Sequence, residues 1–192
     1  MGTTQPLKTA NEIQKLKDYF KKRGVTRDYV LVLLGLNTAL RISDILNLRW
    51  KDIYDFKNKN FYSHLQVYEQ KTGKLNQVYI NLAVLEALNE LLLEQDELYP
   101  DKVLFKSRKG KNTPLSRYQA YNIIKTAGQE LGFGKNFSCH SLRKTFGYHA
   151  WKQGASPIII MSIFNHSSFD ITKRYLSIEQ DDKDMLYSHI KL

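Results

Sequence analysis

The chain of 192 residues has one cysteine, Cys139, only four prolines and no long apolar run. A single cysteine excludes an internal disulfide and a cysteine-rich zinc site, and a chain without disulfides suits a reducing compartment. The longest apolar stretch, residues 29–36, is far too short to span a bilayer. Because no charged and apolar segments of a secretory signal open the sequence, we expect a cytoplasmic protein.

Acidic residues are also scarce. The chain has 19 Asp and Glu against 29 Lys and Arg, which gives a formal net charge of +10. Such an excess predicts a polyanionic partner, with nucleic acid the first choice and an anionic membrane surface the second. The sequence contains no carboxylate cluster suited to magnesium and no glycine-rich phosphate loop. We therefore expect no metal and no cofactor.

The residue pattern predicts an α+β fold that is mainly α-helical with one small antiparallel β-sheet. Alternating apolar and polar residues over 61–82, with a glycine-containing turn, predict a β-hairpin. We expect a single domain over 1–192, with a body at 7–177 and a tail at 178–192. Helical spacing and capping signals predict helices at 9–23, 83–94, after Ser116, at 137–150, after Ser156 and around Tyr175.

The segment 26–50 is rich in helix-forming residues and apolar on almost every side of a helical wheel. The exception is a narrow polar stripe that holds Asn37, Arg41 and Asp44. A helix that is apolar on most sides is buried, so Arg41 is expected in or beside the core. A buried guanidinium needs anionic partners.

His140 and Arg143 stand three residues apart, which places them on one face of a helix. Taken alone, His140 and Arg143 can be interpreted as a structural or surface contact. Arg41 and Asp44 can likewise be interpreted as a buried ion pair. Cys139 beside His140 suggests a thiol protease, but adjacent helical residues do not face each other. We therefore discount that reading.

Taken together, two arginines, two histidines, a hairpin lysine and a late tyrosine fit metal-free attack on a phosphodiester. Arginines offset charge on phosphoryl oxygens in bidentate geometry. Histidine and lysine move protons, and tyrosine is a covalent nucleophile. The set is Arg41, Lys71, His140, Arg143, His166 and Tyr175.

In order and spacing, five segments resemble the motif boxes of the tyrosine recombinases, the phage-integrase family. The resemblance covers roughly residues 7–185 and implies that family's catalytic-domain fold, encoded by a bacterium or a phage. The segments are NTALRISDILNLRW, KTGK, HSLRKTF, FNHSS and TKRYL.

The resemblance implies site-specific DNA recombination or integration through a 3′-phosphotyrosine. Tyr175 matches the nucleophile, and Arg41 and Arg143 match the phosphate clamp. His140 matches the group that assists proton removal, and Lys71 the donor to the leaving oxygen.

Two further residues match supporting positions of the family. His166 matches the residue that hydrogen-bonds the phosphate or positions the arginines, and Asp44 matches the residue that orients Arg41 or His140. The loop at residues 106–111, which we call the basic loop, and the helix that begins after Ser116 are expected to contact DNA. The candidates there are Lys106, Arg108, Lys109, Lys111 and Arg117.

The chain departs from the family at three positions. Glycine is frequent where Ala39 stands and usual where Asn165 stands. Asparagine is the next-best residue for a left-handed helix cap, so that turn should survive. Ser177 stands where histidine is common.

Most family members also have a core-binding domain before the catalytic one, and only a few residues precede the catalytic pattern here. The chain is then either a fragment or a natural short form that grips DNA poorly. Expected partners are double-stranded DNA and other protomers in a tetrameric synapse, with the tail passed to a neighbour, and no membrane.

Two alternative functions stay open. A type IB topoisomerase-like or telomere-resolving enzyme would share the nucleophile without exchanging strands between two sites. A DNA-binding regulator on the same fold would bind DNA without catalysis.

Overall fold

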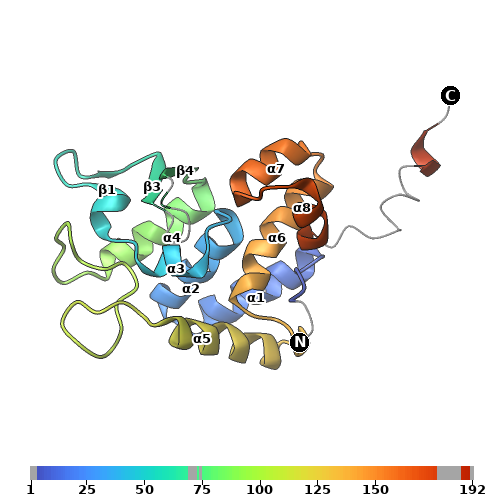
Figure 1. Cartoon of the computed structure of the whole chain (residues 1–192). Helices are drawn as coiled ribbons and strands as arrows, with labels where there is room; N and C mark the ends of the chain where they lie inside the picture. Colours follow the sequence, from blue (N-terminus) through green and yellow to red (C-terminus); the bar gives the residue numbers. More distant parts are fainter. Residues whose placement is uncertain (1–3, 69–72, 74, 177–186, 191–192) are drawn as a thin grey trace. The chain divides into compact units, whose positions relative to one another are not determined.

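In the computed structural model the chain falls into two compact units, Met1–Phe146 and Gly147–Leu192 (Figure 1). The boundary lies inside one helix, α6 (Cys139–Lys152). The prediction of a single catalytic domain over 1–192 stays a prediction. The residues that the structure describes are 4–68, 73, 75–176 and 187–190.

The first unit is built mainly from helices. Thr9 caps α1, because its side chain accepts from the Glu12 amide while Glu12 accepts from the Thr9 amide. Ser116 and Gln119 form the same reciprocal box at the start of α5. These starts were predicted from the sequence and are confirmed. The four long helices are α1 (Ala10–Lys22), α2 (Thr26–Asn37), α4 (Leu82–Leu93) and α5 (Arg117–Glu130).

The expected continuous helix over 26–50 is wrong. The chain leaves α2 after Asn37, and Ala39 adopts a left-handed conformation with φ of 55°. A short helix α3 (Ile42–Leu46) follows, and then a 3₁₀ turn η1 (Trp50–Asp52). The apolar residues are buried as expected, but in separate elements. The break places Arg41 at the start of α3, half-buried.

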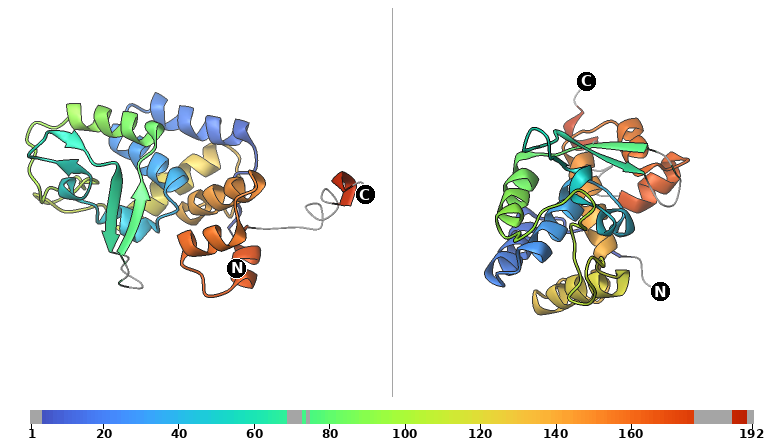
Figure 2. Two further views of the ribbon diagram at one scale, coloured as in Figure 1. Left: turned by 90° about the horizontal axis from the view of Figure 1, so that it is seen from above. Right: turned by 90° about the vertical axis from the view of Figure 1, so that its left-hand side faces the viewer.

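The described residues contain two antiparallel pairs of strands, where one sheet was expected. The predicted hairpin is confirmed as β3 (His64–Tyr68) and β4 (Leu75–Tyr79), which lie side by side in Figure 2. A second pair, β1 (Tyr54–Asp55) and β2 (Asn60–Phe61), was not predicted. Strands of two residues are too short to give an alternating pattern.

Two clusters of buried side chains form the core of this unit, and α2 contributes to both. One gathers around Trp50 and the other around Phe20. At Gly35 the backbone of α2 comes so close to α6 that an added Cβ would lie 2.7 Å from Leu142 Cδ1. The small size of Gly35 therefore fixes how deeply α6 packs at the residue next to Arg143.

The second unit contains the end of α6 and two short helices, α7 (Pro157–Phe164) and α8 (Phe169–Leu176). Gly154 leaves α6 with φ of 82°, and Ser156 with Pro157 starts α7, as predicted. Asn165 ends α7 in the left-handed conformation, which confirms the predicted cap. No helix among the described residues is long and apolar enough to cross a membrane.

Candidate active site

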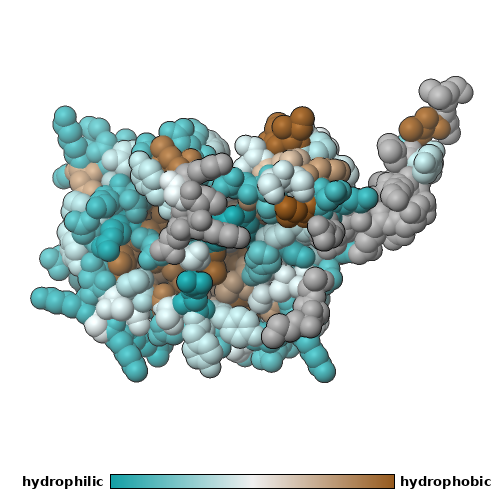
Figure 3. All heavy atoms as spheres, viewed as in Figure 1, coloured by the Kyte–Doolittle hydropathy of each residue, from teal (hydrophilic) through white to brown (hydrophobic). Residues whose placement is uncertain are grey.

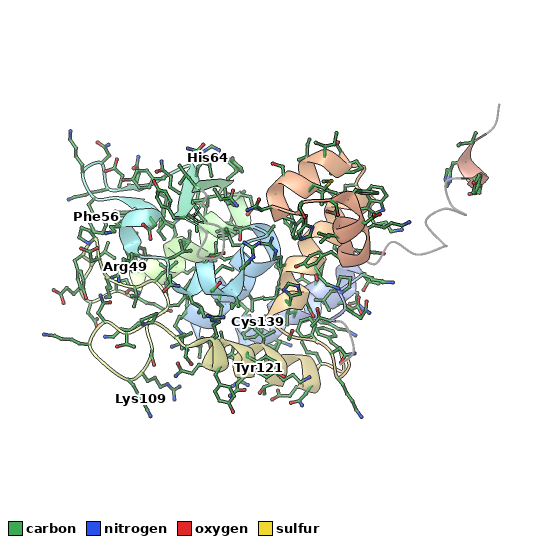
Figure 4. The ribbon with its side chains drawn as sticks, viewed as in Figure 1. Arg49, Phe56, His64, Lys109, Tyr121 and Cys139 are labelled. Atoms are coloured by element: carbon green, nitrogen blue, oxygen red, sulfur yellow. The ribbon has the colours of Figure 1, made fainter. Side chains whose placement is uncertain are left out.

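A pocket of about 390 Å³ in the first unit brings together three of the six residues predicted for catalysis. Arg41 comes from the start of α3, and His140 and Arg143 come from the first turns of α6. Figure 4 labels Cys139 on α6 and Tyr121 on α5, which also line this pocket. The charged or reactive lining residues are Arg41, Arg117, Tyr121, Cys139, His140 and Arg143.

Arg143 is the most deeply buried of the three predicted catalytic residues in this pocket. Its side chain is only 4% exposed, and its Nη1 donates to the carbonyl of Ala39. A guanidinium carries five N–H donors in one plane, so holding one of them orients the others. The left-handed turn at Ala39 thus supplies the carbonyl that holds Arg143 and, two residues later, Arg41 itself. A left-handed position also accounts for glycine being frequent there in the family.

His140 and Cys139 begin α6. Ser138 and Ser141 form a hydrogen bond at the start of this helix, in which the Ser138 amide donates to Ser141 Oγ at 3.2 Å. His140 is exposed. Cys139 and His140 both line this pocket. Burial raises the pKa of the Cys139 thiol to about 12, so it stays protonated and the thiol-protease reading still fails.

The segment before α1 braces α6 directly behind the site. The Lys144 Nζ donates to the carbonyl of Thr4 at 2.8 Å, and the Leu7 amide donates to Thr145 Oγ1 at 2.9 Å. Lys144 is 6% exposed, and burial lowers its pKa. These residues were not singled out from the sequence. They join segments about 140 residues apart, which no local pattern reports.

The second unit brings together two more of the six residues predicted for catalysis. The rings of His166 and Tyr175 lie edge to face, with centroids 5.1 Å apart and planes at 71°. Phe164 stacks on His166 and lies 5.0 Å from the Tyr175 ring. The Tyr175 hydroxyl oxygen is buried in this structure. His166 follows the turn at Asn165, and its amide donates to the carbonyl of Met161 at 3.0 Å, as in a Schellman motif.

Thr172 is a further candidate site residue, one that was not predicted from the sequence. It is fully buried, and its Oγ1 lies 3.0 Å from His166 Nδ1. It stands three residues before Tyr175 in the TKRYL segment, so its place on the Tyr175 face of α8 was visible. Its hydrogen bond to the histidine was not.

The remaining predicted residues are placed as follows. Asp44 is 3% exposed and lies on α3, but it is not among the residues that line the pocket. Its positioning role stays a prediction. Lys71 lies outside the described residues.

The basic loop is a tight, hairpin-like turn. The Ser107 amide donates to the Thr113 carbonyl at 2.8 Å, and the Leu115 amide donates to the Phe105 carbonyl at 2.8 Å. Figure 4 labels Lys109 at the outer edge of this loop. Arg117, which was predicted to bind DNA, lines the same pocket as Arg41 and Arg143, and we call it the arginine pocket. The loop's four predicted cations are all exposed: Lys106, Arg108, Lys109 and Lys111.

Within the described ranges, no group of three or more His, Cys, Asp or Glu residues is placed to hold a metal ion.

A profile of the phage integrase family matches residues 8–181. The chain belongs to the phage integrase family. The resemblance drawn from five short segments is therefore confirmed. The chain is a member of the tyrosine recombinases, a family of enzymes that recombine DNA.

Relatives share the fold, and one of them also shares the length. The chain is 38% identical over 188 residues to "Probable integrase/recombinase YoeC" of Bacillus subtilis, and the match covers 97% of each protein. A crystal structure of XerA recombinase superposes with a TM-score of 0.78 at 22% identity, over 100% of this chain and 68% of that one. A XerH site-specific recombinase bound to its palindromic difH substrate gives a TM-score of 0.75 at 20% identity, over 98% of this chain and 54% of that one.

Proposed function

We propose that the chain is the catalytic domain of a site-specific DNA recombinase or integrase. It cuts and rejoins a DNA strand through a 3′-phosphotyrosine and uses no metal. The observation that carries this proposal is the pocket in which Arg41, His140 and Arg143 meet. The contact of His166 with Tyr175 supports it.

Arg41 and Arg143 offset the charge that develops on the non-bridging oxygens of the scissile phosphate. Without a metal ion, planar guanidinium groups are the side chains best suited to this task. Arg143 is held in place before DNA arrives, because it is buried and anchored on Ala39. Such preorganisation stabilises a transition state without reorganisation at the moment of reaction.

The chemical step is a balanced transesterification. The Tyr175 oxygen forms a bond to phosphorus, and the bond from phosphorus to the 5′ oxygen breaks. His140 assists removal of the Tyr175 proton, and Lys71 donates a proton to the departing 5′ oxygen. The phosphotyrosine keeps the bond energy, so the 5′ hydroxyl of another strand reseals the backbone without ATP.

Access to the nucleophile is part of this mechanism. The Tyr175 hydroxyl oxygen is buried in the free chain, so it must become accessible when DNA binds. His166 hydrogen-bonds the phosphate or positions the arginines. Thr172 Oγ1 lies 3.0 Å from His166 Nδ1, a contact that orients the histidine ring.

Double-stranded DNA and other protomers, in a tetrameric synapse, are the proposed partners. The exposed loop cations and the positive charge of the chain supply phosphate contacts. Contacts of this kind give affinity and salt dependence more than sequence choice.

Covalent capture tests the proposal. Because the target site is unknown, the purified chain is mixed with nicked duplexes of randomised sequence in EDTA, and DNA that survives denaturation on the protein is sequenced. We expect covalent complexes that converge on one sequence, and recombinant product from two copies of that sequence on plasmids. Relaxation without recombinants would favour a topoisomerase, and binding without any covalent complex a regulator.

A further inference from the structure

The arginine pocket contains more positive charge than one phosphodiester needs. Arg117, the first residue of α5, lines it together with Arg41 and Arg143. A phosphodiester carries one negative charge, which the two positive charges of Arg41 and Arg143 already exceed. None of the other lining residues is acidic, and the three not yet named are Ile42, Ser43 and Ser138.

The guanidinium of Arg117 has no polar partner within the described part of the chain. It is exposed, with no hydrogen bond or ion pair there. Arg27, by comparison, binds both Asp28 and the carbonyl of Lys106. An arginine left without a partner beside a pocket of two other arginines raises their mutual repulsion. An additional anion in the pocket would offset that repulsion.

Tyr121 stands one turn after Arg117 on the same face of α5 and lines the same pocket. Its side chain is 43% exposed, and its hydroxyl makes no hydrogen bond to the described residues. The positive end of the α5 dipole lies at Arg117 as well. A cation, a hydroxyl donor and a helix N-terminus therefore converge on one edge of the pocket.

We propose that Arg117 and Tyr121 bind the phosphodiester next to the scissile one. The pocket then holds two successive phosphates of one strand, the scissile one between Arg41 and Arg143 and its neighbour at Arg117. Binding the pair fixes which phosphodiester bond is cut. This inference rests on the proposed function and adds a second phosphate subsite to it.

Neutral phosphates test the subsite directly. In the captured duplex, one phosphate at a time beside the cleavage point is replaced by a methylphosphonate, and the rate of covalent complex formation is measured. At one position we expect the wild-type rate to fall about tenfold to a hundredfold. Arg117→Gln on unmodified DNA should be slowed similarly. The two changes together should be no slower than either alone, since they remove the same interaction.

Lys57→Ala is the control, because Lys57 is an exposed lysine between β1 and β2 that does not line the pocket. Its effect should multiply with that of the methylphosphonate. Tyr121→Phe, which removes only a hydroxyl, should show a smaller effect of the same non-additive kind. If the effects of Arg117→Gln and of every flanking methylphosphonate multiply, the subsite is contradicted and the proposed function stands. If wild-type protein forms no covalent complex, the proposed function fails and this inference with it.

Discussion

At the scale of single residues, the two arginines proposed to clamp the phosphate line one pocket but come from different helices. Arg143 is buried in α6 and anchored on Ala39, whereas Arg41 is half-buried at the start of α3. The anchoring turn and Arg41 are separated by one residue. A substitution of Arg41 therefore alters the pocket but leaves the packing of α6, which carries Arg143, in place.

Arg41→Lys should fold and cleave DNA about tenfold to a hundredfold more slowly. Lysine keeps the charge but lacks the planar fork that holds two oxygens. The measurement is single-turnover covalent complex formation beside a thermal melt. Full cleavage with a lower melting temperature would mean that Arg41 is only a structural partner.

Thr172→Val should slow cleavage about tenfold, because it removes the hydroxyl that lies 3.0 Å from His166 Nδ1 and leaves the shape of the site almost unchanged. Thr172→Ser keeps a hydroxyl and should restore most of the rate. The tautomer of His166, read from its ring nitrogen chemical shifts, should change in the valine variant alone. Equal rates and shifts in both variants would exclude the positioning role.

The sequence indicated which residues belong to the candidate site, but not how they contact one another. Spacing within one helix indicated His140 with Arg143, and the order of the motifs indicated His166 and Tyr175. The contacts that were not predicted include that of Arg143 with the Ala39 carbonyl and that of Thr172 with His166. The first joins residues 104 apart in the chain, and hydrophobic periodicity carries no information about such pairs.

At the scale of elements, the main error was the helix expected over 26–50. Its residues have high helix propensity, but propensity is a weak prior that tertiary packing overrides. The left-handed turn at Ala39 separates α2 from α3 and points Arg41 into the pocket. The capping boxes at Thr9 and Ser116 were predicted correctly, because a cap is a local signal within four residues.

The basic loop should control the salt dependence of DNA binding. Changing its four cations together to alanine should make the slope of log K against log salt less steep, by roughly 0.9 for each phosphate that the protein no longer neutralises. All four side chains are exposed, so the melting temperature should stay the same. Binding titrations at several salt concentrations measure the slope. An unchanged slope would remove this loop from the DNA interface. The four are Lys106, Arg108, Lys109 and Lys111.

At the scale of the whole molecule, the tail at 178–192 is predicted to mediate assembly with other protomers. In the sequence, three apolar residues of the tail have helical spacing, which predicts docking contacts with a neighbouring protomer: Met185, Leu186 and Ile190. Met185 and Leu186 lie outside the described residues, while Ile190 is described and 53% exposed. Figure 3 shows hydrophobic side chains at the surface of α7, where Ile158 is 77% exposed. Exposed apolar groups of this kind are a common feature of surfaces that bind another protein.

We expect a monomer without DNA and an assembly on a DNA with two sites. Deleting residues 178–192 should prevent that assembly. Sedimentation of the full and shortened chains, with and without the DNA, makes the comparison. A stable oligomer that forms without DNA and survives the deletion would show that the tail is not the assembly element.

The identity of the residue that becomes joined to DNA tests the central claim most directly. The covalent complex is digested with protease and nuclease, and the peptide that carries the nucleotide is sequenced by mass spectrometry. We predict that the modification lies on Tyr175, that Tyr175→Phe binds DNA but forms no complex, and that Tyr187→Phe, which alters an exposed tyrosine of the tail, behaves as wild type. A complex that persists in Tyr175→Phe, or a modified residue other than Tyr175, would contradict the mechanism.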